Sequence, residues 1–258
     1  MLDTRPLLLA SGFPKINRGA LTTLQVNLGY LCNQQCQHCH VNAGPKRTEI
    51  MTKETIDQVL GVLQDAQLDC LDLTGGAPEM NPHFRYLVKR ARALGVKVMD
   101  RCNLTILKEP GYTGLAEFLA ENQVEVIASL PCYLPENVDT QRGKGVFADS
   151  IIGLRQLNEL GYGKPDSGLS LHLVYNPIGA DLPPEQVALE ADYRQKLAAY
   201  EVIFNQLFTH LFSFTCFFIN PQNTELENML NLGFEKGYAD GSYEEFLYNH
   251  PLIKDSFF

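Results

Sequence analysis

The chain lacks an excess of positive charge and a long hydrophobic run. Its 258 residues include 21 Lys and Arg against 30 Asp and Glu, for a formal net charge of −9. This acidic balance provides no electrostatic footprint for nucleic acid or an anionic membrane surface, so we expect neither as a partner. The longest apolar-rich stretch, residues 207–219, is interrupted by Thr209, His210 and Ser213 and is too short to cross a bilayer.

A recognisable export signal and a paired set of cysteines are also missing. The apolar segment Leu7–Ala10 is too short for the core of a signal peptide. The seven cysteines are odd in number, and three of them crowd into one loop. Such crowding is poor geometry for disulfides and good geometry for a metal. We therefore expect a cytoplasmic protein whose thiols are reduced.

Short apolar strands alternate with amphipathic helices through most of the chain. The expected strands are Thr22–Leu28, Cys70–Leu73, Val96–Arg101, Val124–Leu130, Leu169–Tyr175 and Val202–Phe204. Helices are expected between them, near residues 52–67, 81–94, 112–121, 149–160 and 183–200. Such alternation predicts an α/β fold with a parallel sheet. Six units favour a partial (β/α)6 barrel of the TIM type, and a doubly wound open sheet is the alternative.

Composition divides the chain into two parts. Residues 1–206 contain the alternating elements and are expected to form the core. Residues 207–258 are first rich in phenylalanine and then acidic and aromatic, with short helices expected at Asn223–Leu232 and Ser242–Tyr248. This C-terminal extension is expected to cover the open side of the barrel or to form a partner surface.

The most informative feature present is a group of three closely spaced cysteines. Cys32, Cys36 and Cys39 follow the first strand with the spacing C-x3-C-x2-C. Three thiolates are one short of the four that close a tetrahedral zinc site or complete a four-iron cluster. A [4Fe–4S] cluster bound here would keep one iron open to another ligand. The alternative is a zinc site completed by His38 or His40, which is cramped so close to Cys39.

Further polar and sulfur-bearing residues follow the next strands, at the edge of a parallel sheet where ligands bind. A glycine pair after the second strand allows close approach of a backbone to a ligand, although a tight turn is the alternative. The residues of this set are Thr74, Gly75, Gly76, Ala77, Cys102, Asn103, Ser129, Cys132 and Arg142. For the polar members a loop cap or a solvated charge is the alternative, and for the two cysteines a buried apolar role.

The cysteine spacing after a first strand resembles that of radical S-adenosylmethionine (SAM) enzymes. The resemblance implies that Cys32, Cys36 and Cys39 hold three irons of a [4Fe–4S] cluster and that SAM chelates the fourth. It further implies that reduction cleaves SAM to methionine and a 5′-deoxyadenosyl radical, with a flavodoxin or ferredoxin as the electron donor. The hard chemistry would belong to the cofactors, and the protein would hold and shield them.

The resemblance extends to the glycine pair and to the residues that follow later strands. The superfamily usually has Gly-Gly-Glu-Pro here, in contact with the SAM ammonium group. In this chain Ala77 stands where the acid is expected, and Glu79 follows two residues later. By position, Asn103 and Ser129 are expected to bind the ribose or carboxylate of SAM, and Arg142 to pair with the carboxylate.

Longer strings resemble the arsenosugar-biosynthesis radical SAM proteins (ArsS-like). They lie within residues 18–205 and include LGYLCNQQCQHCHVNAGP, LDLTGGAPEMNPHFR, DRCNLTIL, ASLPCY and NVDTQRGKGVF. This resemblance implies transfer of the 5′-deoxyadenosyl group to a dimethylated trivalent arsenical. Because trivalent arsenic favours thiolates, our hypothesis is that Cys102 and Cys132 hold it. After Asn205 the chain departs from the family, whose members continue with further cysteines.

Two other classes of function stay open. One is a radical SAM enzyme with another substrate, such as a peptide recruited through the aromatic and acidic extension. The other is a non-catalytic zinc or cluster carrier, which would have no affinity for SAM.

Overall fold

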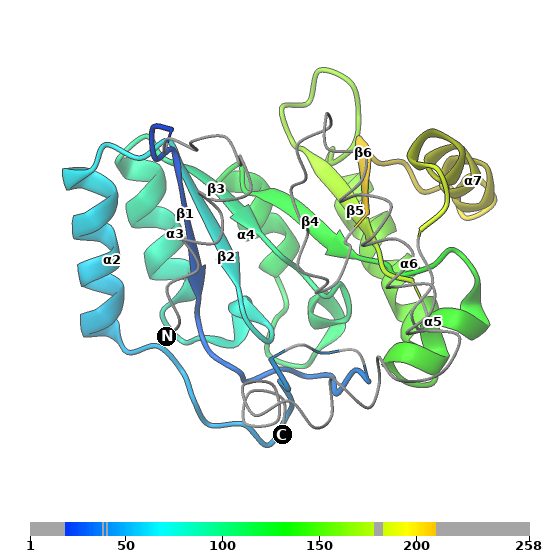
Figure 1. The fold of residues 1–258 in the computed structure, drawn as a ribbon, viewed down its shortest axis with the longest axis horizontal. Helices are drawn as coiled ribbons and strands as arrows, with labels where there is room; N and C mark the ends of the chain where they lie inside the picture. The colour runs from blue at the N-terminus through cyan, green and yellow to red at the C-terminus, as the bar shows by residue number, and fades with distance from the viewer. Residues whose placement is uncertain (1–18, 38, 40, 178–182, 210–258) are drawn as a thin grey trace, which may run out of the picture. The chain divides into compact units, whose positions relative to one another are not determined.

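The computed structural model describes residues 19–37, 39, 41–177 and 183–209. A six-stranded sheet forms the centre of this part (Figure 1). The strands are Thr23–Asn27 (β1), Cys70–Thr74 (β2), Lys97–Asp100 (β3), Glu125–Ser129 (β4), Leu171–Tyr175 (β5) and Gln206–Thr209 (β6). The helices are Lys53–Asp65 (α2), Phe84–Ala93 (α3), Leu115–Glu121 (α4), Pro135–Arg142 (α5), Val146–Glu159 (α6) and Gln186–Ala198 (α7). Two short 3-10 helices are Pro78–Met80 (η1) and Thr105–Lys108 (η2).

The order of the strands distinguishes a partial barrel from a doubly wound sheet. The strands pair in parallel, in the order β1-β2-β3-β4-β5-β6, which is their order along the chain. A doubly wound sheet would reverse this order at a switch point. Within the described residues β1 and β6 are edge strands, so the sheet is open. The predicted partial (β/α)6 barrel is therefore confirmed.

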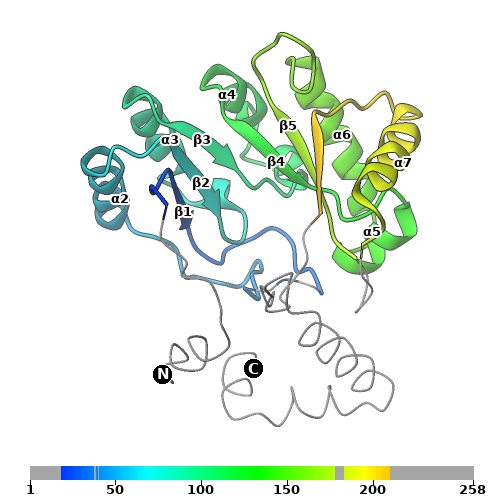
Figure 2. The same ribbon diagram turned by 45° about the horizontal axis from the view of Figure 1, so that its top comes forward.

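The helices cover one face of the sheet (Figures 1 and 2). Helix α2 illustrates how the sequence produces this layer. The side chain of Thr52 caps it by accepting a hydrogen bond from the Thr55 backbone N–H at 3.3 Å. Ile56, Leu60 and Leu63 recur at helical spacing and are buried, because this places them on one face. They join one large core cluster with Leu71 and Leu73 of β2 and other residues of the helix-facing side.

Two elements differ from the sequence-based expectation. The sixth strand was expected at 202–204, but β6 begins at Gln206, so the predicted domain boundary falls at its start. Val202 and Phe204 are buried core residues that precede the strand. Helix α5 was not expected, and Arg142, one of the polar residues expected to follow a strand, lies in its last turn. Pro135 starts this helix at a position where proline is favoured.

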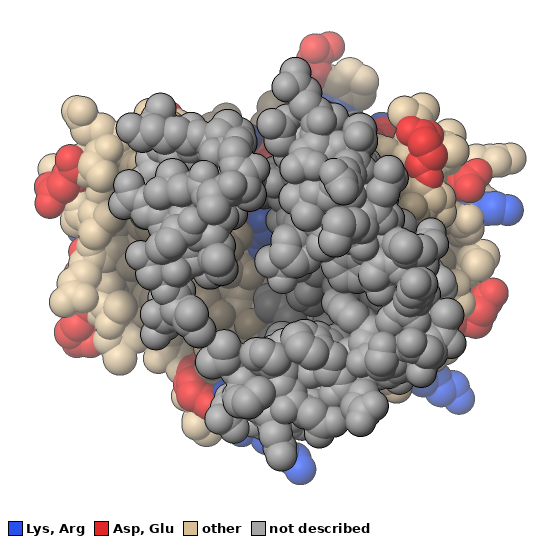
Figure 3. Space-filling view, in the orientation of Figure 1, with Lys and Arg blue, Asp and Glu red and all other residues tan. Residues whose placement is uncertain are grey.

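No helix in the described part of the chain is long and apolar enough to span a membrane. In the face seen in Figure 3, acidic and basic side chains of the described residues are interspersed around the rim. The expected helices at 223–232 and 242–248, and most of the extension, lie outside the described residues.

Candidate functional site

The glycine pair after β2 makes room for the cysteine loop. The Gly76 N–H donates to the Gly29 carbonyl and the Ala77 N–H donates to the Leu31 carbonyl, both at 2.9 Å. A Cβ atom on Gly76 would lie 2.4 Å from the Leu31 carbonyl oxygen. On Gly75, whose φ is +133°, it would lie 2.5 Å from that of Gly29. The backbone that approaches the glycine pair is therefore that of the cysteine loop itself, and contact of the pair with a ligand stays a prediction.

The opposite side of the cysteine loop is tied to α5. The Gln37 N–H donates to the Gln141 carbonyl at 2.9 Å. Within the loop, the Cys32 N–H donates to the Gly44 carbonyl at 3.2 Å, and the Gly44 N–H donates to the Tyr30 carbonyl at 3.0 Å. The loop is thus held between the ends of β1 and β2 and the C-terminal turn of α5.

Two of the three loop cysteines accept N–H groups at sulfur. The buried Cys32 Sγ accepts from the Gln34 N–H at 3.4 Å and from the Asn103 side-chain amide at 3.5 Å. Cys39 Sγ accepts from the Ala43 N–H at 3.2 Å. Burial raises the pKa of the Cys32 thiol, and its two hydrogen bonds act in the opposite direction. Donated N–H groups suit a thiolate ligand, because they spread its negative charge.

A polar network behind Cys32 centres on the buried Thr105 hydroxyl. This hydroxyl accepts from the side-chain amides of Asn33 at 2.9 Å and Gln34 at 2.8 Å. It donates to Asn103 Oδ1 at 3.2 Å. The sequence-based interpretation missed Asn33, Gln34 and Thr105. The signal available was the run of amide residues beside Cys32, together with a second polar residue after β3, two positions beyond Asn103.

The spacing of the loop thiols fits a cluster better than a single ion. Around one tetrahedral zinc, with Zn–S distances of about 2.3 Å, neighbouring sulfurs would lie about 3.8 Å apart. Among the described residues one group of three potential ligands has all its ligand atoms within 4.8 Å of one another, and it does not include Cys32, Cys36 or Cys39. His38 and His40, the alternative zinc ligands, lie outside the described residues. Three separated sulfurs, two of which accept N–H groups, fit a multi-iron centre.

Arg142 and Ser129 meet beside the cysteine loop. The Arg142 guanidinium, on α5, donates from Nη1 to the Ser129 carbonyl at the end of β4. Its Nε atom is buried and has no hydrogen-bond partner. The positive charge lies close enough to Cys32 to lower the pKa of that thiol. An immobilised guanidinium with an unpartnered N–H can bind a carboxylate, and the pairing of Arg142 with the SAM carboxylate stays a prediction.

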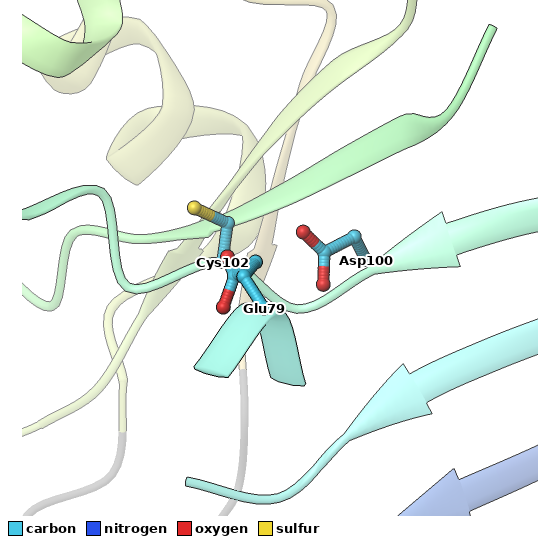
Figure 4. Close-up of side chains that lie close together, drawn as sticks. All are labelled: Glu79, Asp100 and Cys102. Atoms are coloured by element: carbon cyan, nitrogen blue, oxygen red, sulfur yellow. The ribbon is translucent and has the colours of Figure 1, made fainter. Parts of the chain in front are cut away.

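Cys102, one of the two proposed arsenic ligands, lies in a separate buried group with Glu79 and Asp100 (Figure 4). The ligand atoms of the three residues lie within 4.8 Å of one another. Asp100 and Cys102 are fully buried. The carboxylates of Glu79 and Asp100 accept no hydrogen bond from the described residues. Burial, followed by the neighbouring charge of Glu79, raises the pKa of both Asp100 and Cys102 well above their usual values. Burial also raises the pKa of Glu79. The sequence-based interpretation did not group these residues.

Cys132 has different neighbours. Its Sγ accepts from the Leu134 N–H and from the Asn137 side-chain amide, both at 3.5 Å. Cys132 and Cys102 both belong to the large core cluster, and no contact between the two thiols is recorded among the described residues. The structure therefore supports a buried position for each thiol and does not bring them together as a pair.

A charged network lies on the sheet face opposite the helices. Leu71 and Leu73 of β2 face the helices, so strand alternation turns Asp72 to the other face. Asp72 accepts from Arg101 Nη2 at 2.8 Å and from Gln25 Nε2 at 2.7 Å. The buried carboxylate thus positions a guanidinium at the strand ends, on the interior face of the partial barrel. The sequence-based interpretation missed this network, because its members are far apart in the chain. Gln25 lies in β1, Asp72 lies in β2 and Arg101 directly follows β3.

Comparison with protein families and curated proteins agrees with this geometry. The family model described as the Radical SAM superfamily matches residues 26–175. A mycofactocin maturase from Mycolicibacterium smegmatis is 28% identical over 167 residues, which cover 64% of this chain and 41% of that protein. A probable GTP 3′,8-cyclase from Saccharolobus islandicus is 29% identical over 93 residues, which cover 36% and 30% of the two chains. The chain thus spans about two-fifths or less of these curated relatives.

Solved structures share the fold. Streptococcus suis SuiB, in a crystal structure bound to S-adenosylmethionine, superposes with a TM-score of 0.57 at 13% identity, covering 86% of this chain and 49% of SuiB. The protein anSMEcpe, with bound AdoMet, gives a TM-score of 0.55 at 15% identity, covering 90% of this chain and 66% of that protein. At such low identity the likeness concerns the fold.

Proposed function

Because the chain belongs to the radical SAM superfamily, we propose that Cys32, Cys36 and Cys39 hold its [4Fe–4S] cluster and that it attaches an adenosyl group to a small arsenical. The superfamily's cofactors are this cluster and SAM, and when bound they supply a 5′-deoxyadenosyl radical. The observation that carries the site assignment is the N–H donation to the sulfurs of Cys32 and Cys39. The assignment of substrate rests on the resemblance to arsenosugar-biosynthesis proteins.

The chain's own residues have three tasks in this proposal. The three cysteines hold the metal centre at the carboxyl ends of the strands. Arg142 binds and orients the carboxylate of SAM through the N–H left free beside its contact with Ser129. The apolar core under the loop excludes water, which a primary carbon radical requires. An electron donor of the flavodoxin or ferredoxin class completes the proposal.

Of the two thiols predicted to hold arsenic, we propose Cys132. Trivalent arsenic binds thiolates, and the raised pKa of Cys102 beside two carboxyl groups opposes its ionisation. We therefore expect Cys132→Ser to abolish adduct formation and to weaken arsenical binding at least tenfold, while SAM cleavage persists. Cys102→Ser is the matched control and is expected to bind the arsenical within about twofold of the unchanged protein. Isothermal titration with a dimethylated trivalent arsenical measures arsenical binding by the two variants, and product mass measures adduct formation. Equal losses in the two variants, or in neither, would contradict the assignment.

The reaction is tested by product mass. The cluster is reconstituted anaerobically, and the protein is reduced in the presence of SAM and the arsenical. We expect an adenosyl–arsenic adduct. Free 5′-deoxyadenosine without the adduct would refute the arsenical as substrate. It would still support the assignment of the chain as a radical SAM enzyme.

A peptide is the second candidate substrate. Its support is that the first curated relatives are maturases and that SuiB, of similar fold, has a structure bound to a precursor peptide. The interior face, with Asp72 and Arg101 paired at 2.8 Å, provides charged groups for either substrate. Dependence of SAM consumption on an added peptide, with no effect of arsenical, would favour this candidate.

A further inference from the structure

The side-chain amide of Asn103 points at the cysteine loop, which differs from the contact with SAM that the sequence predicts. Asn103 was expected to bind the ribose or carboxylate of SAM. Instead its Nδ2 atom donates to Cys32 Sγ at 3.5 Å and to Asn33 Oδ1 at 2.7 Å. Its side chain is buried, and both recorded contacts of Nδ2 lie in the cysteine loop.

The hydrogen-bond network determines which end of this amide faces sulfur. Asn103 Oδ1 accepts from the Ile106 backbone N–H at 3.1 Å and from the Thr105 hydroxyl at 3.2 Å. A backbone N–H can only donate, so Oδ1 must face Ile106 and the NH2 group must face Cys32. Asn33 supports the same orientation, since its own NH2 donates to Thr105 and to Glu109, which leaves its oxygen as the acceptor for Asn103.

The backbone around Asn103 is strained in a way that holds this position. Leu104 has φ +65° and ψ −44°, a region that L-residues with bulky side chains avoid. Its side chain is fully buried, and its N–H donates to Cys102 Sγ at 3.3 Å. Strain of this kind persists where the surroundings over-determine a conformation, and it is concentrated at functional turns. Across this strained turn the Thr105 hydroxyl donates to Asn103 Oδ1, which holds the two side chains together.

We propose that Asn103 is a positioning residue whose N–H, locked onto the sulfur of Cys32, raises the reduction potential of the cluster. The inference rests on the proposed role of Cys32 as an iron ligand. Reduction adds negative charge that is shared with the cysteine sulfurs, and a donated N–H stabilises that charge. The Gln34 N–H acts on the same sulfur from the backbone, so Asn103 is the part of this pair that substitution can remove.

The test is a potentiometric titration of the reconstituted full chain without SAM, followed by electron paramagnetic resonance. Asn103→Asp keeps the oxygen acceptor for Ile106 and removes the donor, and Asn103→Ala removes both. We expect each variant to lower the ratio of reduced to oxidised cluster at least tenfold at a fixed potential, a shift of about 59 mV for a one-electron couple. Asn137→Ala is the matched control, because that amide lies at the same 3.5 Å from the sulfur of Cys132, which is not a proposed iron ligand.

A second measurement covers the case in which neither variant assembles a cluster. In protein labelled with 15N at the side-chain amide of asparagine alone, pulsed resonance of the reduced cluster should detect a nitrogen coupling from Asn103 Nδ2, which contacts Cys32 Sγ. An unchanged potential in a loaded variant, a shift equal to that of Asn137→Ala, or no coupling in the labelled protein would overturn the inference. If the unchanged chain loads no iron at all, the proposed function fails as well, and iron content separates this outcome from the others.

Discussion

Cluster loading is expected to fall roughly ten- to a hundredfold when Gly76 is replaced by alanine. The new Cβ atom would lie 2.4 Å from the Leu31 carbonyl oxygen, which already accepts the Ala77 N–H at 2.9 Å. Both contacts involve backbone, so the cysteine loop itself must move. Overpacking of this kind costs about 1–3 kcal/mol, and each 1.4 kcal/mol that falls on the loaded arrangement is a factor of about ten in affinity.

The matched control for this substitution is Gly61→Ala. Gly61 lies within α2, where an added Cβ atom meets nothing within 4 Å, and alanine there is expected to stabilise the helix by about 0.5–1 kcal/mol. Iron and sulfide content after anaerobic reconstitution measures loading, and circular dichroism verifies the fold. Equal loading of Gly76→Ala and the unchanged protein would show that the packing of the two loops does not position the cysteines.

Replacing Asp100 with asparagine is expected to stabilise the protein, increasingly so at higher pH. The carboxyl groups of Asp100 and Glu79 have no hydrogen-bond donor, and burial raises the pKa of both. We expect one proton to be shared between them, held mainly by Asp100, because burial and the charge of Glu79 raise the pKa of Asp100. Within the pair, the charge of Glu79 raises the pKa of Asp100, and the charge of Asp72, outside the pair, raises it further.

The raised pKa values determine the sign of the pH dependence. The folded chain holds these protons more tightly than the unfolded chain, whose carboxyl groups titrate near pH 4. The pair therefore imposes no cost below about pH 4, and its cost grows as pH rises toward the folded pKa values. Asparagine removes one titrating group, so we expect a gain of about 1–3 kcal/mol at pH 8 and almost none at pH 4.

Urea unfolding of the reduced apo-protein at pH 4, 6 and 8 measures this effect. Asp69→Asn is the control, because Asp69 is an exposed acid next to β2, where a change within about 0.5 kcal/mol is expected at each pH. Loss of stability in Asp100→Asn at every pH would refute the shared proton. If an equimolar metal ion were also lost from that variant, Glu79, Asp100 and Cys102 would be a cation site instead.

The sequence predicts the architecture well, because the architecture depends on local patterns. The cap at Thr52 and the spacing of Ile56, Leu60 and Leu63 determine α2, and short segments in which apolar residues are adjacent or alternate mark most strands. Helix α5 was missed because its residues are mostly polar and its single buried apolar side chain is Val138. A helix with one apolar anchor shows no period that could be recognised.

In the candidate site, too, residues marked by a local pattern could be predicted, and contacts between distant residues could not. Cys32, Cys36 and Cys39 could be proposed as cluster ligands from the sequence because their spacing in the chain is itself the signal. The contacts of Asn103 with Cys32 and of Asp100 with Glu79 join residues far apart in sequence, so they depend on strand order and register. The glycine pair was predicted to let a backbone approach a ligand closely, and the structure shows the backbone of Leu31 approaching it. Sequence alone does not indicate which loop fills such a space.

The measurement that tests the central claim most directly is SAM cleavage by the reconstituted chain. We expect about four irons per chain and reductant-dependent release of 5′-deoxyadenosine and methionine, both lost in a variant in which Cys32, Cys36 and Cys39 are all alanine. Stoichiometric zinc in place of iron, or release of 5′-deoxyadenosine that persists in that variant, would contradict the account.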